Sequence, residues 1–351
     1  MIKNPGCDII PAMLELSVQA KSPAAITAAI KKIKEMITSG SVARTSPIHL
    51  TLGPGIYREL VRYNLPNPLF LESVPGTKAS DCVIQADNCE AFHHGAENRA
   101  VFVLGPNTTN IKIKNISIIN LHNKSPDVEA VFNPADSAEA LVWASTSGTL
   151  FADGVRVEGR QNTLSLKGVS WFKDCFISGD VDFIYGDVST AFFEECEVNL
   201  REDNRGDFPG FAVKSQALAE KSGFVFMNCR FTGEKRKKNR IFLCRTDGKG
   251  SAGSLKGWDS VAFVNCFFSE NFDEELAWDD DMEKEIYPRG NAMTGIREYN
   301  SKVVLKNGKV TEADTTRRNI KTYLMTEDDY FSRYASRFLI LHDTPFGEVE
   351  S

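Results

Sequence analysis

The sequence predicts an all-β fold, a parallel β-helix in which short strands stack coil upon coil. The first observation is a repeat of the form Phe-x-(Asp/Asn/Glu)-Cys, with copies at 172–175, 193–196, 226–229 and 263–266 and weaker ones at 113–118 and 151–157. The second is spacing. The four cysteines follow one another after 21, 33 and 37 residues, which fits a constant core coil carrying loops of variable length. We interpret each copy as one strand that needs stacked neighbours to bury its apolar side.

The cysteines fit this fold as core residues. Stacking in register brings Cys175 near Cys196, as packed thiols or as a disulfide, because spacing alone does not establish the geometry that a disulfide needs. The other cysteines show no Cys-x-x-Cys spacing: Cys7, Cys82, Cys89 and Cys244. The sequence therefore predicts no structural zinc.

Length and composition indicate an ordinary globular protein that forms one domain over residues 1–351. The chain is 42% hydrophobic and 25% charged, with a net charge of −6, and a solenoid of this size can remain a single domain. Nucleic acid is not expected as a partner, since the one basic run, 235–240, is interpreted as a solvated loop. Membrane insertion is not expected either, because no apolar stretch approaches 18 residues. We expect a monomer.

The two ends are expected to cap the solenoid. Residues 23–37 have apolar positions at helical spacing after Ser22, a candidate N-cap, and this helix would cover the first coil. Residues 48–52 alternate as a strand. We therefore expect a cap over about 1–45, coils over about 46–310 and a helical segment over about 311–351. In that segment a helix begins at Thr326 and carries Phe331, Tyr334 and Phe338 on its apolar face.

Two segments of the chain are rich in acidic residues. In residues 270–295, the run that includes Asp279, Asp280, Asp281 and Glu283 is interpreted as a charged loop rather than a metal site. In residues 179–187, Gly-Asp-Val-Asp-Phe-Ile-Tyr-Gly-Asp, two glycines bracket a strand that breaks the repeat. By the two-residue period, Asp180 and Asp182 share one face of this strand, and Val181 and Phe183 share the other. Carboxylates in a buried sheet need a cationic partner, and Arg245 is the leading candidate.

A pair of amides accompanies these carboxylates. Residues 159–164, Gly-Arg-Gln-Asn-Thr-Leu, place Gln161 beside Asn162 about one coil earlier. Amide N–H groups next to a carboxylate are a candidate oxyanion site. The alternatives stay open: an inert ion pair of Asp182 with Arg245, and a structural ladder of stacked amides.

At these residues the chain resembles the pectin methylesterase (pectinesterase) family of carbohydrate esterases, which form a right-handed parallel β-helix. The family motif GxYxE resembles residues 55–59, GYQDTL resembles 159–164, GTVDFIFG resembles 179–186, LGRPW falls on 243–247, and a late Glu-Tyr pair falls on Glu298 and Tyr299. The similarity spans about residues 25–340. A bacterial branch of the family resembles this chain in carrying GRQNT together with GDVD, and includes thioesterase assignments.

The resemblance implies an enzyme without a cofactor that hydrolyses methyl esters of galacturonate in pectin or oligogalacturonides. Asp182 would be the nucleophile, Arg245 would orient it, and Gln161 would donate to the oxyanion. Tyr185, Phe183, Asp247 and Glu139 are the candidate substrate-binding residues, with Tyr185 along the sugar groove.

Three departures from the family pattern bear on the chemistry. The family acid that protonates methanol is Asn162 here, and an amide cannot supply a proton at neutral pH. The family's first oxyanion glutamine corresponds to Ser137 or to Glu139, depending on the alignment. The family aromatic of LGRPW is Asp247. Glu139 or Asp247 could supply the missing proton. Because a thiolate leaves without an acid, Asn162 also favours a thioester as substrate.

Other functions remain as alternatives. They are a thioesterase or another esterase, a non-catalytic carbohydrate-binding β-helix and, more distantly, a pectate lyase or polygalacturonase. The first 14 residues lack a signal-peptide pattern and eight cysteines suit a reducing compartment, so we expect a cytoplasmic protein acting on imported oligogalacturonides, or a secreted one if a signal was removed.

Overall fold

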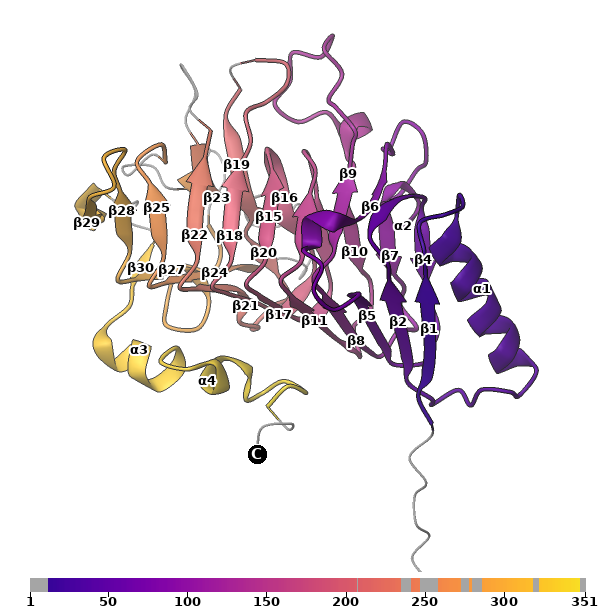
Figure 1. Cartoon of the computed structure of the whole chain (residues 1–351). Helices are drawn as coiled ribbons and strands as arrows, with labels where there is room; N and C mark the ends of the chain where they lie inside the picture. The colour runs from indigo at the N-terminus through magenta and orange to yellow at the C-terminus, as the bar shows by residue number, and fades with distance from the viewer. Residues whose placement is uncertain are drawn as a thin grey trace, which may run out of the picture.

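The protein is a three-sided parallel β-helix. The structure is a computed structural model that describes residues 12–206, 208–234, 241–246, 258–272, 278–279, 286–317 and 322–347. Within this part of the chain, most strands occupy the first, second and third sheets in turn and pair in parallel with their equivalents one coil away. The predicted all-β solenoid is confirmed (Figure 1).

The three sheets contain every strand of the described residues. The first sheet comprises β1 (Leu14–Val18), β2 (Ile48–Leu52), β5 (Leu69–Ser73), β8 (Asn110–Lys114), β11 (Thr149–Asp153), β14 (Gly168–Lys173), β17 (Val188–Glu194), β21 (Gly223–Met227), β24 (Trp258–Val264), β27 (Gly295–Tyr299), β30 (Tyr323–Leu324) and the antiparallel β20 (Gln216–Ala217). The second comprises β3 (Gly55–Arg58), β6 (Cys82–Ala86), β9 (Ser117–Asn120), β12 (Arg156–Glu158), β15 (Phe176–Gly179), β18 (Glu197–Leu200), β22 (Arg230–Gly233), β25 (Phe267–Ser269), β28 (Lys302–Val304) and the antiparallel β29 (Val310–Glu312). The third comprises β4 (Val61–Tyr63), β7 (Phe102–Leu104), β10 (Leu141–Trp143), β13 (Leu164–Leu166), β16 (Val181–Tyr185), β19 (Gly210–Lys214), β23 (Ile241–Arg245) and β26 (Trp278–Asp279).

The Phe-x-(Asp/Asn/Glu)-Cys repeat forms a corner between two sheets, and its interpretation as one strand was wrong. Its phenylalanines lie on the first sheet in register and stack with centroid distances of 5.0, 4.6 and 5.6 Å. The acidic or amide residue that follows has a positive φ, for example 51° at Asp174 and 56° at Asn228. Asp and Asn tolerate this left-handed conformation better than other non-glycine residues, which explains why the repeat selects them.

The cysteines that close each corner are free thiols in the core. Cys175, Cys196, Cys229 and Cys266 are buried and unbonded to one another, so the open question of a Cys175–Cys196 disulfide is answered in favour of packed thiols. Each of the last three donates to a backbone carbonyl of the preceding coil; Cys196 Sγ, for instance, lies 3.3 Å from the Phe172 oxygen. Burial raises the pKa of the Cys175, Cys196 and Cys229 thiols well above the usual range.

The N-terminal helix α1 (Ala25–Thr38) caps the solenoid, although Ser22 is not its N-cap. The helix follows Ala24, which is left-handed and makes no side-chain cap, and its first amides are bound from the solenoid instead. The Glu59 carboxylate accepts from the backbone N–H of Ile26 at 2.9 Å and of Thr27 at 2.8 Å. The segment expected as a cap also contains β1, which pairs with β2, so the sheet begins before residue 46.

The C-terminal segment packs on the outer face of the first sheet, as predicted, but as two helices rather than one. They are α3 (Glu327–Arg333), which Thr326 caps, and α4 (Arg337–Leu341), which Ser336 caps. Of the residues predicted for the apolar face of this segment, Tyr334 is buried, whereas Phe331 and Phe338 are exposed, so that part of the prediction was wrong. Ile340 and Leu341 pack with Trp171 and Phe192 of the sheet. Figure 1 shows both helices below the first sheet. The coils also extend past residue 310, since β30 pairs with β27.

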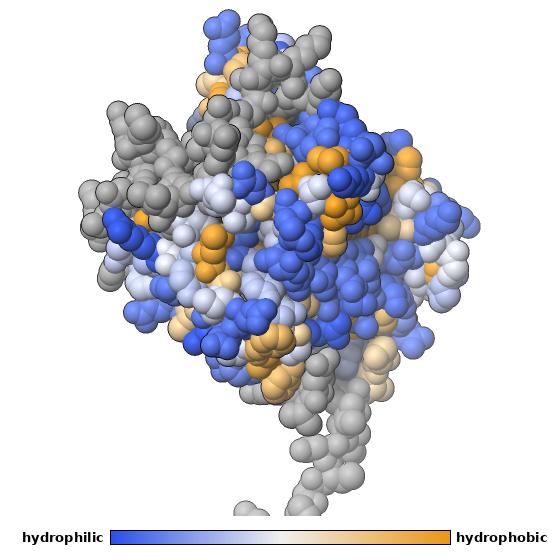
Figure 2. Space-filling view, turned by 90° about the vertical axis from the view of Figure 1, so that its left-hand side faces the viewer, coloured by the Kyte–Doolittle hydropathy of each residue, from blue (hydrophilic) through white to orange (hydrophobic). Residues whose placement is uncertain are grey.

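The remaining short elements lie in the connections, and the face near β28 and β29 is mainly polar. These elements are α2 (Ala96–Arg99), η1 (Ala79–Asp81), η2 (Pro134–Asp136) and η3 (Thr315–Arg317). Figure 2, viewed from the side of β28 and β29, shows a largely hydrophilic surface with small separate hydrophobic groups. The basic run 235–240 and Asp280, Asp281 and Glu283 lie outside the described residues. Within the described ones, no cluster of His, Cys, Asp and Glu could hold a metal, and no helix is long and apolar enough to cross a membrane.

Candidate active site

Strand β16 of the third sheet carries the candidate nucleophile in a break of the normal strand geometry. Asp182 has a φ of 49°, and the pairing of β16 with β19 is irregular between Val181 and Ile184. The alternation of side chains is lost there. Val181 packs in a cluster with Phe211 and Phe242, whereas Phe183 is fully buried in the main core. The prediction that Val181 and Phe183 share a face was therefore wrong, and Phe183 cannot contact a substrate.

The bracketing glycines are required by close packing at this break. A Cβ at Gly179 would lie 2.2 Å from the Cβ of Phe183. Gly186 has a φ of 135°, and a Cβ there would lie 1.9 Å from the Leu166 carbonyl oxygen. No other residue fits either position without displacing the backbone. The Gly-x-x-x-x-x-x-Gly frame thus fixes where the Asp182 side chain leaves the strand.

The predicted pairing of Asp182 with Arg245 is confirmed. Arg245 ends β23, two strands away on the same sheet, and its Nε donates to Asp182 Oδ1 at 2.6 Å while Nη2 donates to Oδ2. Asp182 is 2% exposed and the Arg245 side chain 19% exposed. The guanidinium also faces two rings, with Cζ 5.4 Å from the Phe211 centroid and 6.0 Å from that of Phe132. A two-point contact of this kind fixes the orientation of the carboxylate.

The two amides occupy the neighbouring coil with different surroundings. Gln161 bridges to Val181, so Asn162 lies in register with Asp182, and it has the same left-handed conformation with a φ of 63°. Gln161 is fully buried, and its Nε2 donates to the Asn133 carbonyl at 2.6 Å and to Ser137 Oγ at 3.3 Å. Both N–H groups of Gln161 are therefore engaged, which argues against the predicted oxyanion role. Asn162 makes no side-chain hydrogen bond among the described residues, and its Oδ1 is buried.

Glu139 and Tyr185 form a separate polar group behind the site. Glu139 is fully buried, and it accepts from Arg99 Nε at 2.6 Å, from Arg99 Nη2 at 2.5 Å and from the Tyr185 hydroxyl. Burial, together with Glu139, raises the pKa of Tyr185 well above its usual range. Three donors thus occupy Glu139, which opposes its predicted use as a proton source. The Tyr185 hydroxyl points to Glu139, and Asp247 lies outside the described residues.

Asp180, expected beside Asp182, belongs to a different buried group. Lys124 Nζ lies 2.8 Å from Asp180 Oδ1 and 3.0 Å from Asp203 Oδ2, and all three residues are nearly or fully buried. The Lys124–Asp180 contact is a close ion pair rather than an aligned hydrogen bond, since neither Asp180 oxygen accepts one. Burial raises the pKa of Asp180 although Lys124 opposes this. No motif or spacing points to Lys124, which lies in an irregular connection.

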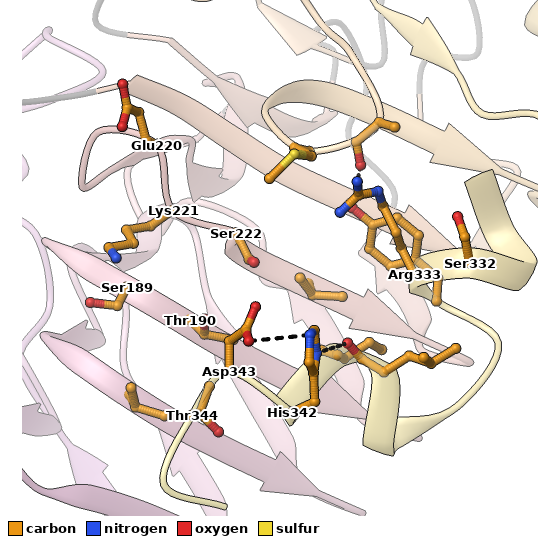
Figure 3. A pocket seen from close by; sticks show the side chains of 17 residues that line it. Ser189, Thr190, Glu220, Lys221, Ser222, Ser332, Arg333, His342, Asp343 and Thr344 are labelled. Carbon is orange, nitrogen blue, oxygen red and sulfur yellow. Dashed lines mark hydrogen bonds and ion pairs between the residues drawn. The ribbon is translucent and has the colours of Figure 1, made fainter. Parts of the chain in front are cut away.

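A hollow lies against the outer face of the first sheet, beside the C-terminal helices. Its volume is about 350 Å³, and it is formed by β17, the segment 220–222 and the C-terminal helices (Figure 3). Ser189, Lys221, Arg333 and His342 are among its lining residues. None of the residues predicted for catalysis lines it, so we place the candidate active site on the third sheet.

A known protein family matches more than half of this chain. The sequence profile described as Pectinesterase matches residues 25–246, which include every catalytic candidate. The chain belongs to the pectinesterase family. Pectinesterase 1 of Olea europaea is 29% identical over 207 residues, which cover 58% of this chain and 53% of that protein. The chain thus spans about half the length of this curated relative.

Solved structures of the family share the fold. A pectin methylesterase from Yersinia enterocolitica superposes with a TM-score of 0.67 at 21% identity, covering 91% of this chain and 99% of that one. A pectin methylesterase in complex with hexasaccharide VII gives a TM-score of 0.63 at 20% identity, covering 89% and 93%. At this identity the likeness establishes the parallel β-helix and no more.

Proposed function

We propose that the protein hydrolyses methyl esters of galacturonate, with Asp182 as the nucleophile. The observation that carries this proposal is the Asp182 carboxylate, which lies at a left-handed backbone position and is held by two N–H groups of Arg245. Each carboxylate oxygen keeps a further lone pair, so one can attack while the guanidinium stays bound. Membership of the pectinesterase family supports the substrate class.

The reaction proceeds in two halves. An oxygen of Asp182 bonds to the ester carbonyl carbon, and the bond from that carbon to the methoxy oxygen breaks, which leaves an acyl anhydride on Asp182. Methoxide takes a proton from water, because residue 162 carries none to give, and leaves as methanol. Water then adds to the galacturonyl carbon and gives one proton to the hydroxide left by the first half, and the bond to Asp182 breaks, which releases the free acid and regenerates the carboxylate. Asn162, whose amide N–H2 is free of protein acceptors among the described residues, donates to the oxyanion.

Methanol release from methyl-esterified pectin tests this proposal directly. Asp182→Asn is expected to lower the rate on the order of 10³-fold or more, since the nucleophile is lost. Asp174→Asn is the matched control, because Asp174 has the same left-handed backbone with a φ of 51° on a corner away from the site. An Asp182→Asn protein as active as the control would refute the assignment.

A second candidate function follows from Asn162. A thiolate leaves without protonation, so a site with no acid favours thioesters over alkyl esters. Two carboxylates among the described residues of this region are engaged, Glu139 by Arg99 and Tyr185 and Asp180 by Lys124. The test is to supply the same proteins with an acyl-CoA and to measure free thiol. Thiol release without methanol release would favour the thioesterase over the methylesterase.

The length of the substrate is a finer part of the proposal. We favour methyl-esterified oligogalacturonides over polymeric pectin, and a hexasaccharide bound to a related pectin methylesterase supports a short ligand. Equal amounts of ester supplied as a hexamer or as polymer would test this. Faster methanol release from the polymer contradicts it.

A further inference from the structure

The connection between β9 and η2 lies beside the Asp182–Arg245 pair. We call residues 123–133 the strap. Its last residues contact three parts of the candidate site: the Asn133 carbonyl accepts from Gln161, the Phe132 ring lies 6.0 Å from Arg245 Cζ, and Val131 packs on the cluster that contains Val181. The strap thus lies directly against the residues of the proposed reaction.

The connection from β18 to β19 fixes the strap in this place. Arg205, whose side chain is 2% exposed, donates from Nη1 to the carbonyls of Val128 at 2.9 Å and Ala130 at 2.7 Å, and from Nη2 to that of Val131 at 3.2 Å. At the other end of the strap, Lys124 exchanges backbone-to-side-chain hydrogen bonds of 3.1 and 3.0 Å with Asn204. Figure 1 shows the two connections rising together above the third sheet.

Buried charges reinforce the same attachment. The Lys124 ammonium lies between Asp180, two residues from the nucleophile, and Asp203, which also binds Arg205 at 2.9 Å. Burial opposes the charged form of Asp203, but hydrogen bonds from Arg205 and the charge of Lys124 lower its pKa overall. A strap held by this many charged contacts presents its tip in one position.

Phe132 is the exposed part of that tip. It is 36% exposed, although its neighbours Val131 and Asn133 are engaged with the site. An aromatic face packs well on the C–H side of a pyranose ring, and such faces are common in sugar and small-molecule sites. The ring therefore offers an apolar surface next to the guanidinium that holds the nucleophile.

We propose that Phe132 contacts the galacturonate ring at the site of ester cleavage, and that the strap, anchored through Lys124 and Arg205, is the element that positions it. This inference rests on the proposed function for its substrate class. Phe132 is then a specificity-determining residue of this chain, and it lies in a connection rather than in a strand.

The test is binding of a methyl-esterified hexagalacturonide to Asp182→Ala, measured by calorimetry without turnover. Adding Phe132→Ala is expected to weaken binding about 3- to 10-fold, the loss of one aromatic contact. Phe132→Tyr, which keeps the ring, should restore binding. Phe331→Ala is the matched control, because Phe331 is 63% exposed on α3 and lies away from the site. If Asp182→Ala has a lowered unfolding midpoint, the Phe132 variants are made in the wild-type protein instead, and their binding to de-esterified hexagalacturonide is measured.

The outcomes separate this inference from the proposed function. Unchanged binding on Phe132→Ala, an equal loss in Phe132→Tyr, or no measurable binding at all overturns the inference even if wild type releases methanol. Wild type that releases no methanol but binds the hexamer through Phe132 overturns the esterase and leaves the contact standing.

Discussion

Replacing Lys124 by methionine tests the buried charge group that holds the strap. Methionine keeps most of the apolar stem of lysine and removes only the ammonium, which lies 2.8 Å from Asp180. Asp180 is then a buried carboxylate whose nearest cation is Arg160, at 3.6 Å. Asp203 keeps Arg205 at 2.9 Å. We therefore expect the cost to come from Asp180.

The size of the cost follows from proton binding. Without Lys124, burial raises the pKa of Asp180 further than it does in the wild type, so the folded protein holds a proton that the unfolded chain releases above about pH 3.9. Stability then falls as pH rises, by about 1.4 kcal/mol per pH unit. The ceiling is about 4 kcal/mol at pH 7 and about 1.5 kcal/mol at pH 5. The wild type already bears part of this cost, so the measured difference lies below the ceiling.

Urea unfolding at pH 5, 6 and 7 measures this difference. Lys124→Met should be less stable than wild type by roughly 2–4 kcal/mol at pH 7, and the deficit should shrink toward pH 5. Lys124→Met/Asp180→Asn should recover most of it, because no unpaired charge remains. Lys173→Met, which removes a partly exposed lysine paired with Asp174, should change stability by less than about 0.5 kcal/mol. A deficit equal at pH 5 and pH 7, or a double variant no better than the single one, would refute the argument.

Three further predictions concern the site, the core and the cap. Asn162→Asp should raise the rate of methanol release on the order of 10²-fold, because a carboxyl beside Asp182 supplies the missing acid. The control Asn228→Asp, at an exposed left-handed corner, should leave the rate unchanged, and an unchanged rate in Asn162→Asp would show that proton supply is not limiting. The free energy of unfolding should be constant to about pH 8 and fall above it, because the buried thiols, including Cys82 with a pKa raised to about 12, stay protonated in the folded protein, whereas the unfolded chain loses those protons from about pH 8.5. Urea midpoints measured from pH 7 to 10 check this, and midpoints that stay constant to pH 10 contradict it. Glu59→Ala should destabilise the protein by about 2 kcal/mol, because two backbone N–H groups of α1 lose their acceptor, and hydrogen exchange of the variant should show faster opening of α1 than of β17. Equal protection of α1 in the variant and the wild type would exclude Glu59 as the cap of α1.

The solenoid could be predicted from sequence because its signal repeats. Phe172 and its equivalents recur at the same point of successive coils, so a period is visible without any knowledge of the loops. What each copy forms was not visible, since Phe-Lys-Asp-Cys reads equally as a strand or as a corner. The positive φ at Asp174 decides between them, and only the backbone reveals it.

The candidate site was predictable to the extent that it lies in local motifs. Asp182 and Arg245 could be paired because a carboxylate in a buried sheet needs a cation, and few cations lie in equivalent strands. The two-residue period failed at the same place, since one left-handed residue puts Val181 and Phe183 into different clusters. Lys124, Arg99 and Phe132 could not be predicted. They come from connections whose path depends on tertiary contacts.

The same backbone device serves both structure and chemistry in this chain. At the corners, a left-handed Asp or Asn turns the chain from the first sheet to the second, and its side chain points to solvent or to a neighbouring corner, as Asn300 does to Asn265. Asn162 and Asp182 adopt the conformation on the third sheet instead, in adjacent coils and in register. There the left-handed residue of each coil carries a buried polar side chain, and that of Asp182 pairs with Arg245. A site of this kind needs only a carboxylate at a position where the solenoid already tolerates a turn, together with one cation two strands away, and this explains how a repetitive fold can hold a single reactive residue without disturbing its core.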